Sequence, residues 1–190
     1  MVKPLPSPEV IRQLISYHPH TGKLFWMERG VEWFNDPETD HRRTAKDICS
    51  MWNTRYAGRE AIYSIDGNGY RSGTIFSVQV KAHRIAWVLS TGAWPSCQID
   101  HVNGVRSDNR LCNLREADYA QNARNCGIRR DNTSGFKGVS RANGKWRAGI
   151  KVNGKRLNLG QFDSPEEANQ AYLEASKKHH GLFSRSEVRQ

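Results

Sequence analysis

The sequence lacks the closely spaced cysteines that mark zinc ribbons and secreted disulfide scaffolds. Its four cysteines, Cys49, Cys97, Cys112 and Cys126, are widely separated, and no two of them lie two residues apart. Structural zinc sites and disulfide frameworks depend on paired or numerous cysteines. We therefore expect free thiols and no structural zinc.

Long apolar runs are missing as well. No stretch approaches the roughly 20 consecutive apolar residues of a membrane-spanning helix, and no charged-then-apolar leader opens the chain. With 37% hydrophobic content, 190 residues can bury one or two small cores but not a large enzyme barrel. These absences predict a cytoplasmic protein without a membrane partner, built from two or three small modules.

Acidic side chains are few relative to basic ones. The 29 Lys and Arg residues exceed the 19 Asp and Glu residues, which gives a formal net charge of +10. Such an excess attracts polyanions, among which nucleic acid is the leading partner class. A merely soluble basic protein is the alternative, because runs of charge are often solvated surfaces.

Local patterns predict an α+β fold. A short helix is expected within residues 7–19, and small antiparallel hairpins are expected within residues 21–80. An exposed loop is expected at residues 35–43. Apolar residues at helical spacing predict a helix at 82–89, and a strand, a turn, a second strand and a helix are expected within residues 99–125.

The last part of the chain predicts a three-stranded sheet covered by a helix. Three strand-like runs, at 136–141, 145–152 and 155–159, are separated by turn signals and followed by a capped helix from Ser164. In the second run Trp146, Ala148 and Ile150 alternate with polar or small residues, and Leu157 and Leu159 extend the apolar face. The other face is expected to carry Arg147, Lys151, Arg156 and Asn158.

This basic face has the residue types that read DNA. Arginine pairs with guanine and asparagine with adenine in the major groove, which a small sheet can enter. Simple solvent exposure of the face is the alternative. We favour contact with double-stranded DNA.

One stretch between the predicted helix and the second module combines polar groups that suit hydrolysis. Asp100 and His101 end a strand, and the expected strand–turn–strand–helix order brings Asn122 back beside Asp100. Carboxylate and amide oxygens are ligands that Mg²⁺ prefers. Successive side chains of a strand point to opposite faces, so Asp100 and His101 reach one site only if the strand end twists or bulges.

The stretch IDHVNGVRSDNRLCNLREADYAQNARN resembles the HNH nuclease motif in its His-Asn-Asn form, as found in phage and intron-borne homing endonucleases. The resemblance implies a ββα-metal core in which His101 is the general base that activates water. It implies Asp100 and Asn122 as ligands of one Mg²⁺ or Mn²⁺ ion per active site. It also implies a catalytic role for Asn113, as the middle asparagine that braces the loop.

For three further polar residues in or near this motif we favour roles outside catalysis. His83 is similar to a histidine often present upstream of the motif in phage relatives, and we favour helix packing or a phosphate contact over catalysis. Asn103 and Asn109 are interpreted as turn formers.

Residues 134–183 resemble the Apetala/ethylene-response-factor DNA-binding domain. The resemblance lies in Gly138-Val139, Leu159-Gly160, Phe162-Asp163 and Glu166-Glu167-Ala168. It places Lys151 and Arg156 at positions that contact DNA in the plant domains. Ser140, Gly149 and Asn158 replace larger side chains there, so the plant target sequence is not expected to carry over.

These observations predict a phage-type HNH homing endonuclease that nicks one strand of double-stranded DNA per active site. We expect an N-terminal α+β region at 1–80 that also contacts DNA, a nuclease core at 81–128, a linker at 129–133 and the DNA reader at 134–183. A monomer is expected, with a dimer left open, and a phage-encoded protein would act in the host cytoplasm.

Two other functions stay open at this point. The first is a non-enzymatic, sequence-specific DNA-binding protein with a degenerate nuclease motif. The second is a structural RNA-binding protein that uses the same basic surface. The intact Asp100, His101 and Asn122 favour the enzyme over both.

Overall fold

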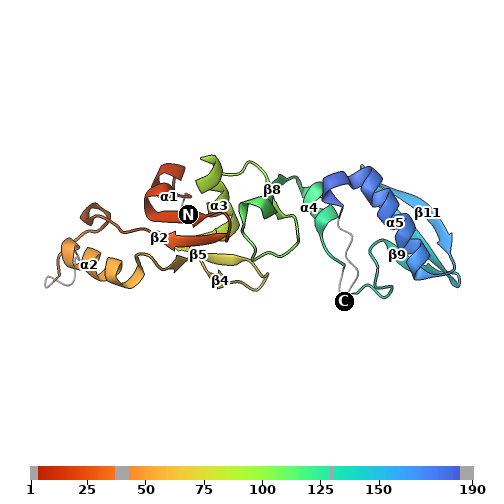
Figure 1. The fold of residues 1–190 in the computed structure, drawn as a ribbon, viewed down its shortest axis with the longest axis horizontal. Coiled ribbons are helices and arrows are strands. Elements are labelled where there is room, and N and C mark those ends of the chain that lie inside the picture. The colour runs from red at the N-terminus through yellow and green to blue at the C-terminus, as the bar shows by residue number, and fades with distance from the viewer. Residues whose placement is uncertain (1–3, 37–42, 129–130, 185–190) are drawn as a thin grey trace. The chain divides into compact units, whose positions relative to one another are not determined.

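The computed structural model describes residues 4–36, 43–128 and 131–184. It divides into two compact units, residues 1–116 and 117–190. Each unit combines helices with small antiparallel strands (Figure 1), and the predicted α+β class is confirmed. Within the part of the chain described, every helix is too short or too polar to span a bilayer.

The first unit contains short helices and three small sheets. Helix α1 (Pro8–Leu14) begins at Ser7, whose hydroxyl accepts a hydrogen bond from the backbone N–H of Val10 at 3.3 Å. The predicted helix is too long, because Ile15 already starts a strand. The following elements are β1 (Ile15–His18), β2 (Lys23–Trp26), the 3-10 turn η1 (Val31–Trp33), α2 (Ala45–Tyr56), β3 (Glu60–Ala61), β4 (Ser64–Ile65), β5 (Arg71–Ile75), β6 (Val78–Lys81), α3 (Ala82–Thr91), β7 (Gln98–His101), the 3-10 turn η2 (Leu111–Asn113) and β8 (Leu114–Ala117).

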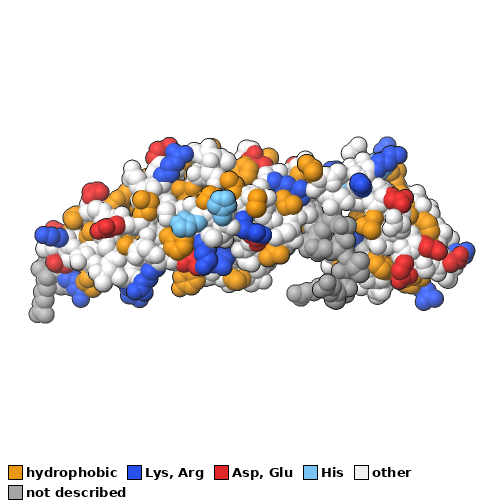
Figure 2. Space-filling view, viewed as in Figure 1, with side chains coloured by type: hydrophobic (Ala, Val, Ile, Leu, Met, Phe, Trp, Pro, Cys, Tyr) orange, Lys and Arg blue, Asp and Glu red, His pale blue; other side chains and the backbone are white. Residues whose placement is uncertain are grey.

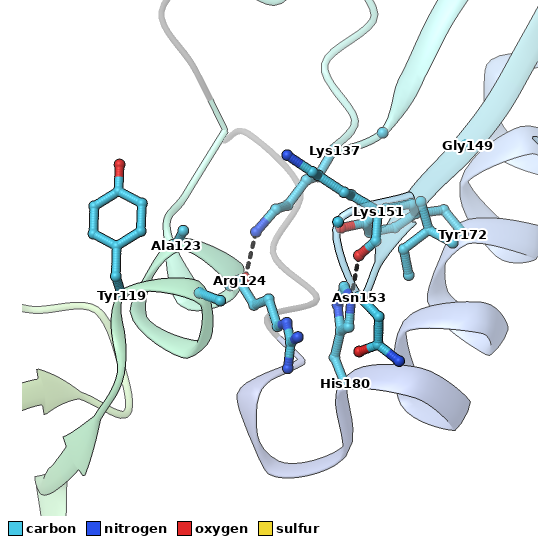
Figure 3. A pocket seen from close by; sticks show the side chains of 13 residues that line it. Tyr119, Ala123, Arg124, Lys137, Gly149, Lys151, Asn153, Tyr172 and His180 are labelled. Atoms are coloured by element: carbon cyan, nitrogen blue, oxygen red, sulfur yellow. Dashed lines mark hydrogen bonds between the residues drawn. The ribbon is translucent and has the colours of Figure 1, made fainter. Parts of the chain in front are cut away.

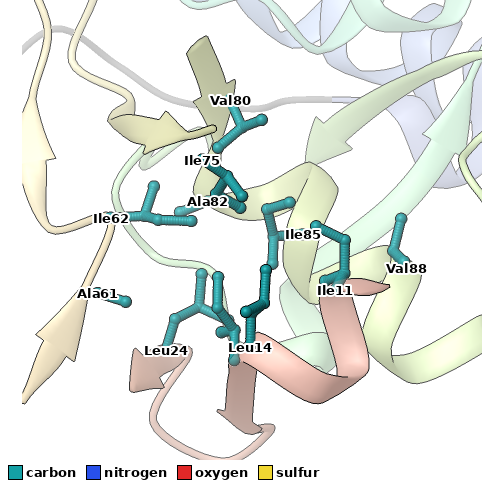
Figure 4. Packing of buried hydrophobic residues seen from close by; sticks show 11 residues of the cluster. Ile11, Leu14, Leu24, Ala61, Ile62, Ile75, Val80, Ala82, Ile85 and Val88 are labelled. Carbon is teal, nitrogen blue, oxygen red and sulfur yellow. The ribbon is translucent and has the colours of Figure 1, made fainter. Parts of the chain in front are cut away.

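One apolar cluster joins these elements. Ile11 and Leu14 of α1 face Ile85 and Val88 of α3, and all four side chains are completely buried. Figure 4 shows Leu24, Ala61, Ile62, Ile75 and Val80 around them, contributed by the hairpins. The hairpins and the two helices therefore share a single core.

Helix α2 contradicts the expectation of hairpins alone within residues 21–80. Thr44 and Asp47 form a reciprocal cap, in which Asp47 N–H donates to the Thr44 hydroxyl at 3.3 Å and Thr44 N–H donates to Asp47 Oδ2 at 2.8 Å. Cys49 is its buried residue, so the helix has little of the apolar periodicity that sequence patterns detect. Most of the loop expected at 35–43 lies outside the described residues.

A smaller cluster attaches the β7–β8 sheet to α3. Ile99 of β7 and Leu114 of β8 are buried against Ala86 of α3, with Tyr17 and Trp87 packed beside them. Two strands alone are marginally stable in water. The sheet that carries Asp100 and His101 therefore depends on α3 for its position.

The second unit contains the three-stranded sheet and the helix that the sequence predicts. Its elements are α4 (Tyr119–Asn125), β9 (Val139–Ala142), β10 (Lys145–Val152), β11 (Lys155–Phe162), α5 (Pro165–His180) and the 3-10 turn η3 (Gly181–Phe183). The strand order is β11-β10-β9, and all pairs are antiparallel. Val139, Ala148 and Ala168 form the buried centre between sheet and helix. The first strand starts at Val139, three residues later than predicted, and runs to Ala142.

A bulge changes the predicted alternation along β11. Ala148 pairs with Gly160 and Gly149 pairs with Asn158, so Leu159 is the extra residue between these pairs. Leu159 packs against the core, as expected. Leu157 does not, because its side chain is 40% exposed although it lies opposite the buried Ile150.

Replacing Ile85 by Ala should lower the free energy of unfolding of the first unit by about 2–5 kcal/mol, because it removes a completely buried side chain from the shared core. Ile65→Ala is the matched control, since this isoleucine is 63% exposed. Urea unfolding of the full chain, with hydrogen exchange of first-unit amides, measures the effect. Equal stability of the two variants would contradict the described core.

Candidate active site

Strand β7 ends in two buried polar residues, Asp100 and His101, each 4% exposed. Their side chains have different partners. Asp100 Oδ2 accepts a hydrogen bond from Arg115 Nε at 2.8 Å, and Arg115 Nη2 lies 2.7 Å from the same oxygen. Arg115 stands on the neighbouring strand β8, so the sheet itself supplies the charge that makes a buried carboxylate tolerable.

His101 contacts the side chain of Asn109. Its Nε2 lies 3.1 Å from Asn109 Oδ1, and Asn109 is only 1% exposed. The interpretation of Asn109 as a turn former is therefore wrong: its side chain is buried against the candidate base. The sequence signal is weak, because asparagine is common in turns and its burial depends on residues far away in the chain.

The loop between β7 and β8 is held by Asn113. Its Oδ1 accepts a hydrogen bond from the backbone N–H of Asn103 at 2.9 Å, and its Nδ2 donates to the carbonyl of Asp108 at 2.7 Å. Its own carbonyl accepts from the N–H of Val102 at 2.9 Å. This one side chain thus joins both halves of the loop, and Asn113 itself is buried.

Asp108 braces the outer side of the same loop. Arg110 donates to both of its carboxylate oxygens, at 2.8 and 2.6 Å, and Asn103 Nδ2 donates to it at 2.8 Å. The hydrogen bond from Arg110 is the largest cause that lowers the pKa of Asp108, to about 2. Asn103 keeps its predicted turn role, since its Oδ1 accepts from the N–H of Val105 at 2.8 Å.

His83, at the start of α3, lies against the candidate base. Its ring centroid is 5.2 Å from that of His101 with the planes at 80°, and Tyr70 packs on both rings at 5.1 and 5.9 Å. Packing is therefore the role that the structure describes for His83, and the packing partner is the candidate base. Its Nδ1 is buried and has no hydrogen-bond partner among the described residues.

Burial favours the neutral form of both histidines. It lowers the pKa of His83 to about 3, and the neighbouring His101 adds to the decrease. Burial also lowers the pKa of His101, although the hydrogen bond to Asn109 and the Asp100 carboxylate oppose this. Near neutral pH both rings are neutral, which is the state that a general base requires.

Basic side chains lie close to Tyr70. The Arg106 guanidinium lies 5.0 Å from the centre of the Tyr70 ring and donates to the carbonyl of Asn68 at 2.7 Å. The Lys81 ammonium lies 6.0 Å from the same ring and is paired with Asp66. Figure 2 shows histidines next to lysine and arginine side chains on the face drawn. Local sequence patterns do not reveal this group, because Tyr70, Lys81 and Arg106 belong to three separate segments.

Asn122 belongs to the second unit. It lies on α4, which begins at Asp118 with a reciprocal cap to Gln121 at 2.7 and 2.8 Å, as the sequence predicts for its start. Among the described residues no group of three or more His, Cys, Asp or Glu side chains could hold a metal ion. The predicted donor set is different in kind, because it combines one carboxylate with one amide oxygen, and both suit a hard divalent cation.

The structure brings the four candidate DNA-binding residues together on one face of the second sheet. Lys151 pairs with Arg156 and Gly149 pairs with Asn158 across β10 and β11. Arg147 lies on β10, two residues before Gly149. All four side chains are exposed. Arg147, Gly149, Arg156 and Asn158 line a shallow pocket of about 190 Å³. A Cβ on Gly149 would lie 3.2 Å from Arg156 Nε, so the small residue makes room for this pocket.

A second cavity of the same unit, of about 420 Å³, was not predicted. Figure 3 shows it between α4, the sheet and the end of α5. The Lys137 ammonium donates to the carbonyls of Arg124 and Cys126 at 2.5 and 2.6 Å, and His180 Nε2 lies 3.0 Å from the Lys151 carbonyl. Lys137 thereby satisfies carbonyls at the end of α4, where a helix leaves them without partners.

Residues 80–124 match the family model of the HNH endonucleases. A protein of Escherichia phage T7 named protein 3.8 is 32% identical over 108 residues, which are 55% of this chain and 88% of the T7 protein. The chain belongs to the family of T7 protein 3.8. The HNH resemblance of the sequence is confirmed, and such a domain implies DNA binding. No solved structure gives a significant match to this member of the protein 3.8 family.

Acid should destabilise the first unit through His83. Its pKa of about 3 in the folded protein lies below the ordinary histidine value of about 6.5, so the unfolded chain takes up the proton first as the pH falls. The contribution of the neutral His83 ring to stability is complete above about pH 6.5 and decreases as the pH falls toward 3. We expect a loss on the order of 2–3 kcal/mol between pH 7 and pH 4.5.

Urea unfolding at both pH values measures this loss. His83→Gln, which does not titrate, should lose less stability than the wild type, and exposed His20→Gln should behave like the wild type. The same pH dependence in wild type and His83→Gln would show that another group causes the acid sensitivity.

Proposed function

We propose that this protein is a homing-type DNA endonuclease that hydrolyses phosphodiester bonds with a single divalent cation. The observation that carries the proposal is the burial of His101 beside Asp100 within the HNH match. Burial lowers the pKa of His101, which favours the neutral form that a general base needs. His101 takes a proton from a water molecule, and the resulting hydroxide attacks phosphorus in line with the leaving oxygen. Asn113 keeps the loop after His101 in place during this step.

Asp100 and Asn122 would hold the Mg²⁺ or Mn²⁺ ion. When bound, such an ion neutralises the charge that develops on the phosphate and on the leaving oxygen. Arg115 orients the Asp100 carboxylate on the strand. Because each chain carries one such set of residues, we propose that a monomer nicks one strand per encounter.

We propose that the second sheet is an Apetala/ERF-like DNA reader, linked through residues 129–133 to the nuclease core at 81–128. Its face carries three exposed cations, Arg147, Lys151 and Arg156, together with the amide of Asn158. Arg147 and Asn158 are suited to base edges in the major groove, and Lys151 and Arg156 to phosphates. Kinship with a phage protein supports the host cytoplasm as the place of action.

His101→Ala should decrease the rate of DNA nicking by about 10²–10⁴-fold, because the general base is lost. DNA affinity should stay the same, since the buried ring is not a phosphate contact. The assay compares wild type, His101→Ala and exposed His20→Ala on phage DNA, with Mg²⁺ and with a chelator. Equal nicking by all three proteins would exclude this active site. Tight binding by a wild type that never nicks would favour the non-enzymatic alternative.

Replacing both Lys151 and Arg156 by Gln should weaken DNA binding and reduce its salt dependence. Each lost phosphate contact lowers the slope of log K against log salt by about 0.9, so the pair should lower it by about 1.8. Lys177→Gln with Lys178→Gln is the matched control, because these exposed lysines stand on α5. Equal slopes for both double variants would show that the sheet face makes no special phosphate contacts.

A further inference from the structure

The contact between His101 and Asn109 defines which ring nitrogen carries hydrogen. An amide oxygen only accepts hydrogen bonds, so the 3.1 Å contact from His101 Nε2 to Asn109 Oδ1 requires an N–H on Nε2. A neutral imidazole has one N–H, and its lone pair for accepting a proton then lies on Nδ1. A general base acts in its neutral form, so this tautomer is the one that the cleavage step uses.

Asn109 is itself held by the first hairpin of the chain. The Tyr17 hydroxyl, on β1, donates to the Asn109 carbonyl at 2.7 Å. Burial raises the pKa of Tyr17 to about 12, so this hydroxyl stays a donor at any physiological pH. Next along the chain, the N–H of Leu111 donates to the carbonyl of Pro19 at 3.1 Å.

Gly22 lets the hairpin turn approach this segment closely. Its φ is +72°, and a Cβ would lie 2.5 Å from Arg110 N and 2.6 Å from Asn109 C. Only glycine fits this contact, because the left-handed backbone and the missing side chain are both required. The turn between β1 and β2 therefore supports the backbone of Asn109.

The burial of the Asn109 amide group lowers the stability of the fold. Its Nδ2 is buried without a hydrogen-bond partner among the described residues. A buried donor without a partner destabilises a protein, and an apolar side chain of similar size avoids this. An apolar residue, however, could not accept the hydrogen bond that Asn109 Oδ1 accepts from His101 Nε2.

We propose that Asn109 is a positioning residue for the general base. Its Oδ1 holds the N–H on His101 Nε2 and thereby leaves Nδ1 as the atom that receives the proton. In the cleavage step a water O–H bond breaks, its proton goes to Nδ1, and the water oxygen bonds to phosphorus. The bond from phosphorus to the leaving oxygen breaks, and that oxygen takes a proton from solvent. This inference rests on the proposed role of His101 as general base.

Three variants of the full chain test the proposal. Asn109→Leu removes the acceptor with little change in size, and Asn109→Asp keeps an acceptor oxygen. Tyr17→Phe removes only the hydroxyl that holds the Asn109 backbone, and Tyr63→Phe is its matched control, because Tyr63 is 62% exposed. Long-range proton–nitrogen NMR spectra identify which nitrogen of His101 is protonated, with His101→Gln used for assignment.

We expect wild type and Asn109→Asp to have the hydrogen on Nε2, and Asn109→Leu to lose this preference. The turnover rate of Asn109→Leu should fall about 10- to 100-fold without a change in KM, and Asn109→Asp should restore most of it. Tyr17→Phe should lower the rate more than Tyr63→Phe does. A hydrogen on Nδ1 in the wild type, or an unchanged tautomer in folded Asn109→Leu, would overturn the proposal.

The NMR measurement separates this inference from the proposed function. If wild type does not nick DNA, the endonuclease proposal fails, but the protonated nitrogen of His101 still shows whether Asn109 sets the tautomer. If Asn109→Leu does not fold, the wild-type tautomer and the comparison of Tyr17→Phe with Tyr63→Phe decide whether Asn109 positions His101. If nicking occurs and Asn109→Leu nicks at the wild-type rate, the positioning role alone is excluded.

Discussion

The attachment of β7 and β8 to helix α3 is the constraint on which the candidate active site depends. A two-stranded sheet has no stable core of its own. Ile99 and Leu114 are buried against Ala86 of α3, with Tyr17 and Trp87 beside them, and α3 in turn packs on α1 and the hairpins. The apolar contacts of the first unit thus determine where the polar ends of β7 lie.

Polar groups near these strands are buried in pairs. Asp100 is compensated by Arg115, and His101 by Asn109, while Asn113 satisfies backbone groups of the loop. Low solvent access strengthens each of these hydrogen bonds, and it penalises a positive charge on His83 or His101. The same burial that makes the site costly to build keeps the candidate base neutral.

Patterns within a short stretch of sequence predicted much of the fold and of the site. The strand ending in Asp100-His101, the helix starting at Asp118 and the turns of the second sheet all depend on neighbouring residues, and all are present. Three features could not be predicted locally. The burial of Asn109 depends on Tyr17, 92 residues away. The exposure of Leu157 accompanies a bulge, and α2 buries too little apolar surface to show helical periodicity.

The amide nitrogen of Asn109, which has no hydrogen-bond partner in the described parts of the chain, has a consequence for laboratory evolution of this protein. Selection for thermal resistance alone would favour an aliphatic residue at this position, since filling the space with carbon relieves an unmet donor. If Asn109 sets the tautomer of His101 as proposed, such a selection would enrich stable variants whose imidazole lacks the productive tautomer. A library screened by both heat and DNA cleavage would instead retain the asparagine and gain its robustness elsewhere.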